Sequence, residues 1–285
     1  MRFLVLGATG MAGHLISLYL KERGHTVVGF SRRGVRFLDS QVLGDIRDEK
    51  LLQDSIDEGD FDVIVNCIGV LNKAAETNPD AAWLNGELPH VLSGMTANKQ
   101  TRVFHMSTDC VFAGNTGPYT ETSEPDGESA YDRTKAAGEL RDGRNLTFRN
   151  SIVGPDMNPG GIGLLNWFMG QHGPVKGFTG AIWTGLTTLE LAKAMEHEAC
   201  EEAHGLVNMV PEGSINKYDL LQLFNRELRG GAIEIMPDAG LQLDKTLVRT
   251  NFEPSYRPKS YPEQVREMAG WIREHRELYP HYEVI

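Results

Sequence analysis

The chain has 285 residues, 40% of them hydrophobic, so it can bury the core of one large α/β domain that carries a smaller lobe. Its formal net charge of −11 argues against nucleic acid or an anionic membrane as a partner. No apolar run approaches the roughly 18 residues that span a bilayer. The three cysteines lack metal or disulfide spacing, so we expect no metal site and a cytoplasmic protein.

The first half of the chain alternates short apolar runs with stretches of helical spacing. Strands are predicted over residues 3–6, 26–30, 63–68 and 102–106, and helices over residues 10–23, 51–56 and 81–97. This alternation is typical of βαβ units. It therefore predicts an α/β fold with a doubly wound parallel sheet and helices on both faces.

A glycine-rich turn lies between the first predicted strand and the first predicted helix. Gly7 permits a tight exit from the strand, Gly10 lets the backbone approach a pyrophosphate, and Gly13 lets helix and sheet pack closely. Thr9 and Met11 lie in the same turn, and the helix amino end offers unpaired N–H groups to phosphates. In this context the turn predicts a Rossmann-type dinucleotide site, with a merely structural turn as the alternative.

The end of the second strand indicates which dinucleotide is bound. An NAD site usually has a carboxylate there, but this chain has Ser31, Arg32 and Arg33, and no acid before Asp39. Because a guanidinium suits a 2′-phosphate, NADP(H) is preferred, and NAD(H) remains the alternative if the arginines are simply solvated. Further cofactor contacts are expected in the loops that follow the sheet strands, at Asp45, Ile46, Cys67, Ile68 and Gly69.

The alternation breaks after about residue 149. Residues 154–180 contain eight glycines and three prolines, which predicts a functional loop. Helices are then predicted over residues 188–197, 217–228 and 261–279, with a strand over residues 205–209. We expect residues 1–154, plus about 181–210, to form the NADP-binding domain. Residues 155–180 and 211–285 should form a substrate-binding lobe over the carboxyl ends of the strands.

Tyr131 and Lys135 are four residues apart in a predicted helix, which puts both on one face. An ammonium and a cationic nicotinamide near a phenol would lower its pKa from about 10. The tyrosine can then give a proton to a carbonyl oxygen as hydride arrives at carbon. Thr108, after a predicted strand, can hold the same oxygen. An ordinary exposed helical pair is the alternative.

The glycine turn, the Ser107–Phe112 stretch and the Tyr131/Lys135 pair together resemble the extended short-chain dehydrogenase/reductases. The chain is most similar to their dTDP-4-dehydrorhamnose reductase (sugar-nucleotide-binding) branch. The resemblance implies that Thr108, Tyr131 and Lys135 are catalytic, with Tyr131 and Lys135 also touching the cofactor. It implies a sugar-nucleotide pocket that includes Lys73, Asp109, Asn166 and Trp183, although Trp183 can equally be a packing residue. One departure is Cys110, where the family often has an aromatic residue.

The expected function is therefore NADPH-dependent reduction of a nucleotide-linked 4-keto-6-deoxy sugar, with Tyr131 as the proton donor, in cell-surface polysaccharide sugar biosynthesis. A dehydratase is disfavoured, because the related 4,6-dehydratases carry Asp-Glu after the threonine and this chain has Asp109-Cys110. A nucleotide-sugar epimerase and a non-catalytic NADP-binding regulatory subunit remain as alternatives. The expected partner is a small nucleotide sugar, and a homodimer is an open possibility because family members are often dimers.

Overall fold

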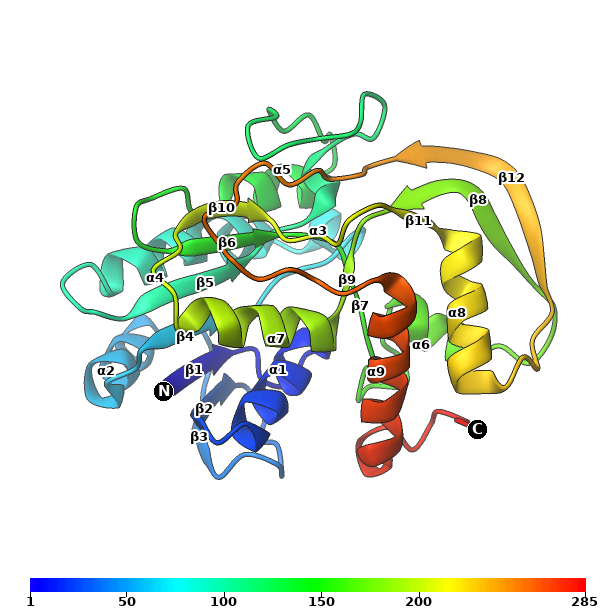
Figure 1. Cartoon of the computed structure of the whole chain (residues 1–285). Helices are drawn as coiled ribbons and strands as arrows, with labels where there is room; N and C mark the ends of the chain where they lie inside the picture. The colour runs from blue at the N-terminus through cyan, green and yellow to red at the C-terminus, as the bar shows by residue number, and fades with distance from the viewer.

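The computed structural model describes residues 1–285, and its centre is a seven-stranded sheet in the order β10-β6-β5-β4-β1-β2-β3 (Figure 1). The strands are β1 (Arg2–Leu6), β2 (Thr26–Ser31), β3 (Ser40–Leu43), β4 (Val63–Asn66), β5 (Arg102–Met106), β6 (Leu146–Arg149) and β10 (Gly205–Asn208). Every neighbouring pair is parallel. The strand order reverses between β1 and β4, as in a doubly wound sheet, so the predicted fold class is confirmed.

The two faces of the sheet are buried by different helices. Successive side chains of β1 alternate, so that Phe3 and Val5 join one core while Leu4 and Leu6 join the other. Helices α1 (Met11–Glu22) and α7 (Thr188–Ala199) pack side by side on the first face, and α2 (Glu49–Gly59) and α4 (Leu88–Met95) cover the second (Figure 1). This double burial explains why the central strands are continuous apolar runs.

A smaller lobe lies beside the sheet and is built around three further strands (Figure 1). They are β8 (Val175–Trp183), β11 (Ile215–Asn216) and β12 (Ile235–Asp244), accompanied by α6 (Leu164–Met169), α8 (Lys217–Arg229) and α9 (Tyr261–Glu274). The short pair β7 (Ile152–Val153) and β9 (Leu186–Thr187) forms a separate ladder. The expectation of one loop over residues 154–180 is wrong, because α6 and most of β8 lie there. Pairing of β8 with β12 stabilises a strand that its own glycines disfavour.

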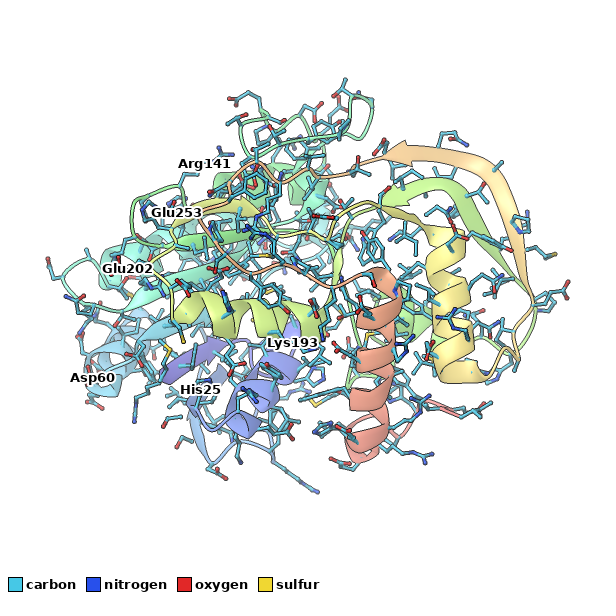
Figure 2. All side chains as sticks on the ribbon, viewed as in Figure 1. His25, Asp60, Arg141, Lys193, Glu202 and Glu253 are labelled. Carbon is cyan, nitrogen blue, oxygen red and sulfur yellow. The ribbon has the colours of Figure 1, made fainter.

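Several helices differ from the expected ranges. A π-helical turn, Trp83–Glu87, precedes α4 where one continuous helix was expected, and a 3₁₀ turn, Arg276–Leu278, follows α9. The remaining helical segments are α3 (Ala74–Thr77), a 3₁₀ turn at Asp109–Val111, and α5 (Ala130–Ala137). Charged side chains such as those of Asp60, Glu202 and Glu253 lie exposed around the outside (Figure 2). No helix combines the length and the apolar character needed to cross a bilayer.

Candidate active site

Two adjoining cavities open along the carboxyl ends of the central strands. One has a volume of about 350 Å³ and the other about 570 Å³. Both are lined by residues that follow β1 and β4, and they share Gly10, Cys67, Ile68, Gly69, Leu71 and Ile162. The cavities therefore form one continuous site at the switch point of the sheet, where doubly wound folds bind their ligands.

The glycine turn meets the geometric requirements of a pyrophosphate site. Gly7 has a φ of +78°, and a Cβ at Gly13 would lie 2.2 Å from the Gly7 carbonyl oxygen. Helix α1 begins after Gly10 with no side-chain cap and no acidic residue in its first turn, so its leading N–H groups stay free for an anion. Thr9, Gly10 and Met11 line the cavities, whereas Gly13 acts through packing. These residues fit a dinucleotide.

Part of the segment that is predicted to select the cofactor lines the larger cavity. Ser31 and Arg32 line it, but Arg33 does not, and the Ser31 hydroxyl donates to the Arg33 carbonyl at 2.6 Å. Asp39, the first acid after β2, instead pairs with Lys21 at 2.8 Å and takes no part in the lining. Asp45 and Ile46 also line this cavity, as expected.

Arg47 is a further cation in the same cavity, which the sequence analysis did not single out. Its guanidinium lies 4.2 Å from the centre of the Trp83 ring and pairs with Asp80. Arg47 directly follows Asp45 and Ile46, and this place in the loop after β3 is the sequence feature that could have identified it as a cavity residue. Arg47 is thus held at the cavity wall by a stacking contact and an ion pair.

Thr108, Tyr131 and Lys135 all line the smaller cavity, so the structure brings the three predicted catalytic residues together. A capping box between Ser129 and Asp132 fixes the start of α5. Tyr131 and Lys135 consequently lie one turn apart, and both are buried. Thr108 caps the short turn after β5 by accepting the Cys110 N–H at 3.1 Å, which orients its hydroxyl.

The expectation of a lowered tyrosine pKa included a bound cationic nicotinamide, and the electrostatics of the ligand-free triad differ from that bound state. Burial raises the pKa of Tyr131, and the hydrogen bond with Thr108 only partly opposes it. The Lys135 side chain donates through Nζ to the Met106 carbonyl at 2.5 Å. Burial also lowers the pKa of Lys135 to about 8. Tyr131 therefore holds its proton in the ligand-free protein.

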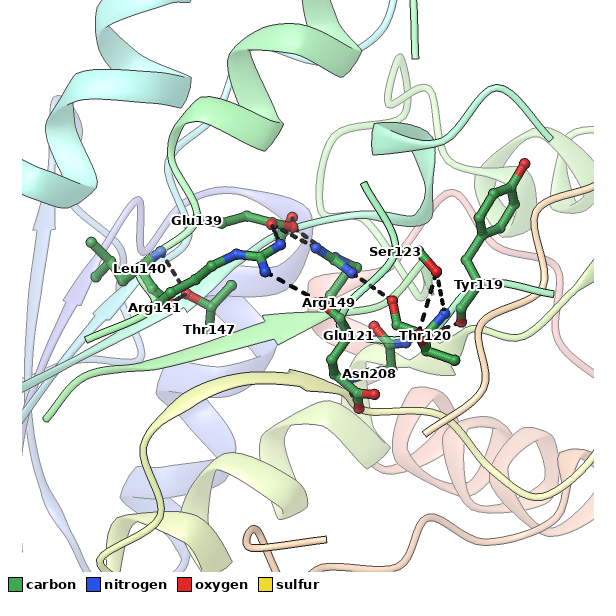
Figure 3. A network of polar contacts seen from close by, with 11 residues as sticks. Tyr119, Thr120, Glu121, Ser123, Glu139, Leu140, Arg141, Thr147, Arg149 and Asn208 are labelled. Carbon is green, nitrogen blue, oxygen red and sulfur yellow. Dashed lines mark hydrogen bonds and ion pairs between the residues drawn. The ribbon is translucent and has the colours of Figure 1, made fainter. Parts of the chain in front are cut away.

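A buried ion pair between Glu139 and Arg149 is the centre of a polar network (Figure 3). Glu139 accepts from Arg149 at 2.7 and 2.6 Å and from Arg141 at 3.0 Å. It also accepts the Ser107 hydroxyl at 2.8 Å. Burial would raise the pKa of Glu139, but these hydrogen bonds and the Arg149 charge lower it overall. The network therefore anchors the end of β5 that carries Thr108.

The four residues predicted to bind the sugar nucleotide do not line either cavity. Lys73 is exposed just before α3, and Asp109 is buried beneath Thr108, whose hydroxyl donates to it at 3.2 Å. The Asn166 amide donates to the carbonyls of Pro159 and Gly161 at 3.1 and 2.7 Å.

Trp183 is 4% exposed and packs against Tyr261, with ring centres 5.8 Å apart. It and Asn166 thus hold the smaller lobe together in this structure, which matches the packing alternative for Trp183.

Other residues occupy the cavity wall in their place. The smaller cavity is lined by Asn72, Asn150, Ser151, Asp156 and Ile162. Asn72 has a φ of +47°, which is unusual for a residue other than glycine. Asn150 and Ser151 follow β6, so recognising that strand would have placed them at the carboxyl edge of the sheet with the other site residues.

The sequence of the chain is similar to one protein family and to several individual proteins. The model of the family described as "RmlD substrate binding domain" matches residues 1–145. A probable low-salt glycan biosynthesis reductase of Haloferax volcanii is 34% identical over 139 residues, 47% of this chain and 46% of that protein. A dTDP-4-keto-6-deoxy-D-glucose reductase of Streptomyces niveus is 30% identical over 175 residues, 60% of this chain and 54% of that protein.

A different kind of relative is the methionine adenosyltransferase 2 subunit beta of Xenopus laevis, 31% identical over 148 residues, 48% of this chain and 41% of that protein. The chain thus spans about half the length of the curated relatives that it matches. Among solved structures, a dTDP-4-dehydrorhamnose reductase of Bacillus anthracis in complex with NADP superposes with a TM-score of 0.78 at 17% identity. The match covers 94% of this chain and 98% of that one, and it establishes a shared fold.

Proposed function

Because the chain belongs to the RmlD substrate binding domain family, we propose that it is an NADPH-dependent reductase of a nucleotide-linked 4-keto-6-deoxy sugar. Membership of the family confirms the resemblance inferred from the sequence. The observation that carries the proposal is the convergence of Thr108, Tyr131 and Lys135 on a cavity continuous with the glycine turn. The similarity to reductases of Haloferax volcanii and Streptomyces niveus supports the same activity, and the glycan biosynthesis reductase of Haloferax volcanii supports a role in glycan biosynthesis.

In this proposal each residue has a distinct task. The free N–H groups at the start of α1 bind the pyrophosphate. Bound NADPH supplies the hydride that reduces the ketone carbon. Tyr131, kept protonated by burial, donates its proton to the ketone oxygen, and Thr108 holds that oxygen through its hydroxyl. The ketone becomes a secondary alcohol when one hydride and one proton have been added.

We propose NADPH rather than NADH because Arg32 and Arg47 both line the larger cavity. Two guanidiniums suit a 2′-phosphate, while Asp39, the acid nearest the end of β2, is paired with Lys21. The Arg32→Ala variant should bind NADPH at least tenfold more weakly and leave NADH binding nearly unchanged, as measured by fluorescence titration. Equal losses for both cofactors would show that Arg32 does not recognise the 2′-phosphate and would contradict this part of the proposal.

We also propose that residues 155–180 and 211–285 form the substrate-binding lobe. Asp156, Ile162 and Leu164 bring this part of the chain to the wall of the smaller cavity, which residues of the cofactor turn also line. The sugar nucleotide would then lie between the lobe and the ends of β5 and β6. A homodimer and a cytoplasmic location complete the proposal.

The decisive experiment is a panel of deoxythymidine- and uridine-diphosphate 4-keto sugars assayed by NADPH absorbance. At least one should be reduced, and Tyr131→Phe should lose at least a hundredfold in kcat while binding NADPH as tightly as the wild type. If no sugar nucleotide consumes NADPH and the protein holds NAD tightly through purification, the epimerase alternative replaces this proposal.

The similarity to a methionine adenosyltransferase subunit favours a second candidate, a non-catalytic NADP-binding regulatory subunit. Retention of Thr108, Tyr131 and Lys135 in one cavity weighs against it, since a regulatory role requires no proton donor. Co-purification with an adenosyltransferase, together with no turnover of any sugar nucleotide, would support this second candidate.

A further inference from the structure

Three buried polar side chains form a line behind the smaller cavity. Asn66 ends β4, His105 lies opposite it on the neighbouring strand β5, and Lys135 projects from α5. The Asn66 Nδ2 atom is 3.3 Å from His105 Nδ1, and His105 Nε2 is 3.4 Å from Lys135 Nζ. Only Lys135 lines the cavity, so Asn66 and His105 act on the site through it.

The backbone fixes which atoms in this line carry hydrogens. The Ile68 N–H can only donate, and it donates to Asn66 Oδ1 at 3.1 Å. The Asn66 amide group must therefore turn its Nδ2–H toward His105 Nδ1, which accepts. Burial and the Lys135 charge keep the pKa of His105 well below its usual range, so the ring is neutral. A neutral ring that accepts at Nδ1 carries its hydrogen on Nε2.

This tautomer presents an N–H donor to Lys135. An ammonium has three donors and no acceptor, so only the neutral amine, through its lone pair, can accept the His105 Nε2–H. The other close contact of Nζ, the Met106 carbonyl, takes a single N–H and is satisfied by either form. The His105 contact therefore favours the amine form of Lys135.

Other charged groups act on the same two side chains. Glu139, four residues after Lys135, and Cys67, after β4, favour the ammonium form of Lys135. His90 on α4 acts on His105 in the same sense as Lys135. Burial outweighs Glu139 and Cys67 and lowers the pKa of Lys135 to about 8, so the ammonium releases its proton more readily than an ordinary lysine does.

We propose that His105, locked by Asn66 in its Nε2–H tautomer, is a positioning residue that holds Lys135 poised to release its proton. The proposal rests on the proposed reductase function, in which Tyr131 gives up a proton at every turnover. When Lys135 restores it, an N–H bond on Lys135 breaks and the O–H bond of Tyr131 re-forms. The lone pair left on Nζ accepts the His105 Nε2–H, and solvent later reprotonates the amine.

The first test needs neither a variant nor a substrate. In protein labelled with ¹⁵N-histidine, two-bond proton–nitrogen correlations distinguish the two neutral tautomers of His105. We expect a protonated Nε2 and an unprotonated Nδ1 between about pH 6 and 9, because a ring with a strongly lowered pKa stays neutral over this range. A protonated Nδ1, or a positively charged ring at pH 7, would overturn the proposal.

The second test reverses the tautomer. In Asn66→Asp the carboxylate can only accept, so His105 must carry its hydrogen on Nδ1 and offer Nε2 as an acceptor to the ammonium. The midpoint of Lys135 deprotonation, followed by the ¹⁵Nζ shift in the cofactor-free protein, should rise by about one pH unit or more. The alkaline limb of kcat should move in the same direction.

A matched background separates the tautomer from the added charge. In His105→Phe the imidazole that links Asn66 to Lys135 is absent. Adding Asn66→Asp in that background should therefore move the midpoint of Lys135 deprotonation much less than it does with His105 present. An equal shift in both backgrounds would show that the carboxylate acts through its charge alone, and would refute the proposal. Because both midpoints are read without substrate, failure of the proposed reductase activity would leave this result intact.

Discussion

Substitution of Gly13 tests how closely α1 packs against the phosphate-binding turn. A Cβ at this position would lie 2.2 Å from the Gly7 oxygen and 2.8 Å from the Gly7 carbonyl carbon, and both are backbone atoms that cannot rotate away. Gly13→Ala should therefore push α1 from β1, destabilise the protein by about 1–3 kcal/mol and weaken NADPH binding at least tenfold. Urea unfolding and fluorescence titration measure the two effects.

The matched control is Gly94→Ala in α4, where a Cβ meets nothing within 4 Å. Alanine is a better helix former than glycine, so this change should stabilise the protein by up to about 1 kcal/mol without altering NADPH binding. If both glycine variants behaved alike, the close approach of Gly13 to Gly7 would not govern the turn.

Glu139 gives a second prediction, in which the pH dependence follows from the lowered pKa. Glu139→Gln leaves the Arg149 guanidinium buried without its counter-charge and should cost about 3–5 kcal/mol at pH 7. Because the folded-state pKa of Glu139 is lowered, its contribution exists above its unfolded pKa of about 4.3 and is lost as pH falls through the folded value.

The stability gap between Glu139→Gln and the wild type should therefore be full at pH 7 and narrow as the pH falls below about 4, as measured by urea unfolding. Asp54→Asn removes an exposed partner of Lys50 and serves as the control, with an expected change below about 0.5 kcal/mol. A gap that stayed constant down to low pH would mean that the Glu139 charge is not responsible.

At the scale of helices and strands, the segment after α9 contacts helix α1, which follows the cofactor turn. His14 on α1 contacts the Gly10 carbonyl through Nδ1 at 2.9 Å and the Tyr279 hydroxyl through Nε2 at 2.8 Å. Burial lowers the pKa of His14, so the neutral ring donates at Nδ1 and accepts at Nε2. The Tyr279 hydroxyl also accepts the Trp271 indole N–H at 3.2 Å. The segment after α9 thereby braces the start of α1.

Tyr279→Phe should strand two buried polar groups, His14 Nε2 and the Trp271 N–H, and destabilise the protein by about 1–3 kcal/mol. Because His14 touches Gly10, NADPH affinity should also fall several-fold. Tyr19 is on the same helix as His14, and its hydroxyl donates to Glu196 on α7. Tyr19→Phe removes this hydroxyl, so it should destabilise the protein but leave NADPH binding unchanged. Loss of affinity in both variants would point to general loosening of α1.

The elements that were predictable from sequence are those whose pattern is set locally. Strands β1, β2, β4 and β5 are buried on both faces and therefore read as apolar runs, and a glycine turn followed by helical spacing identifies α1. By contrast, β12 is mostly exposed, and its residues lack the alternation of a half-buried strand. It is a strand because it pairs with β8, and this pairing is a long-range contact that its own residues do not predict.

The same distinction applies to the site. Thr108, Tyr131 and Lys135 line one cavity because the fold brings the end of β5 to α5, and the four-residue spacing of Tyr131 and Lys135 predicts that these two share a helix face. Asn166 and Trp183 were expected to face a ligand, yet their partners come from residues distant in sequence or from loop carbonyls. Their orientation depends on the packing of the smaller lobe, which no local pattern encodes.

At the scale of the whole molecule, both parts of the chain line the cavities that would hold the ligand. Ile162 from the smaller lobe and Leu71 from the sheet side line both cavities, and both are exposed apolar side chains. A ligand that covers exposed apolar side chains at a cavity mouth removes their surface from water, and this stabilises the complex. Ile162 also lies among three glycines, Gly160, Gly161 and Gly163, so its backbone can adjust at low cost.

NADPH should therefore slow amide hydrogen exchange at residues 160–164 and 69–72 together. Exchange reports local opening, and a ligand that bridges the two segments must be released before either one opens. Mass spectrometry of peptides with and without NADPH measures the change. Residues 238–242, in the exposed part of β12, line neither cavity and should exchange at the same rate in both states. Protection of residues 69–72 alone would mean that the cofactor binds to the sheet side without engaging the smaller lobe.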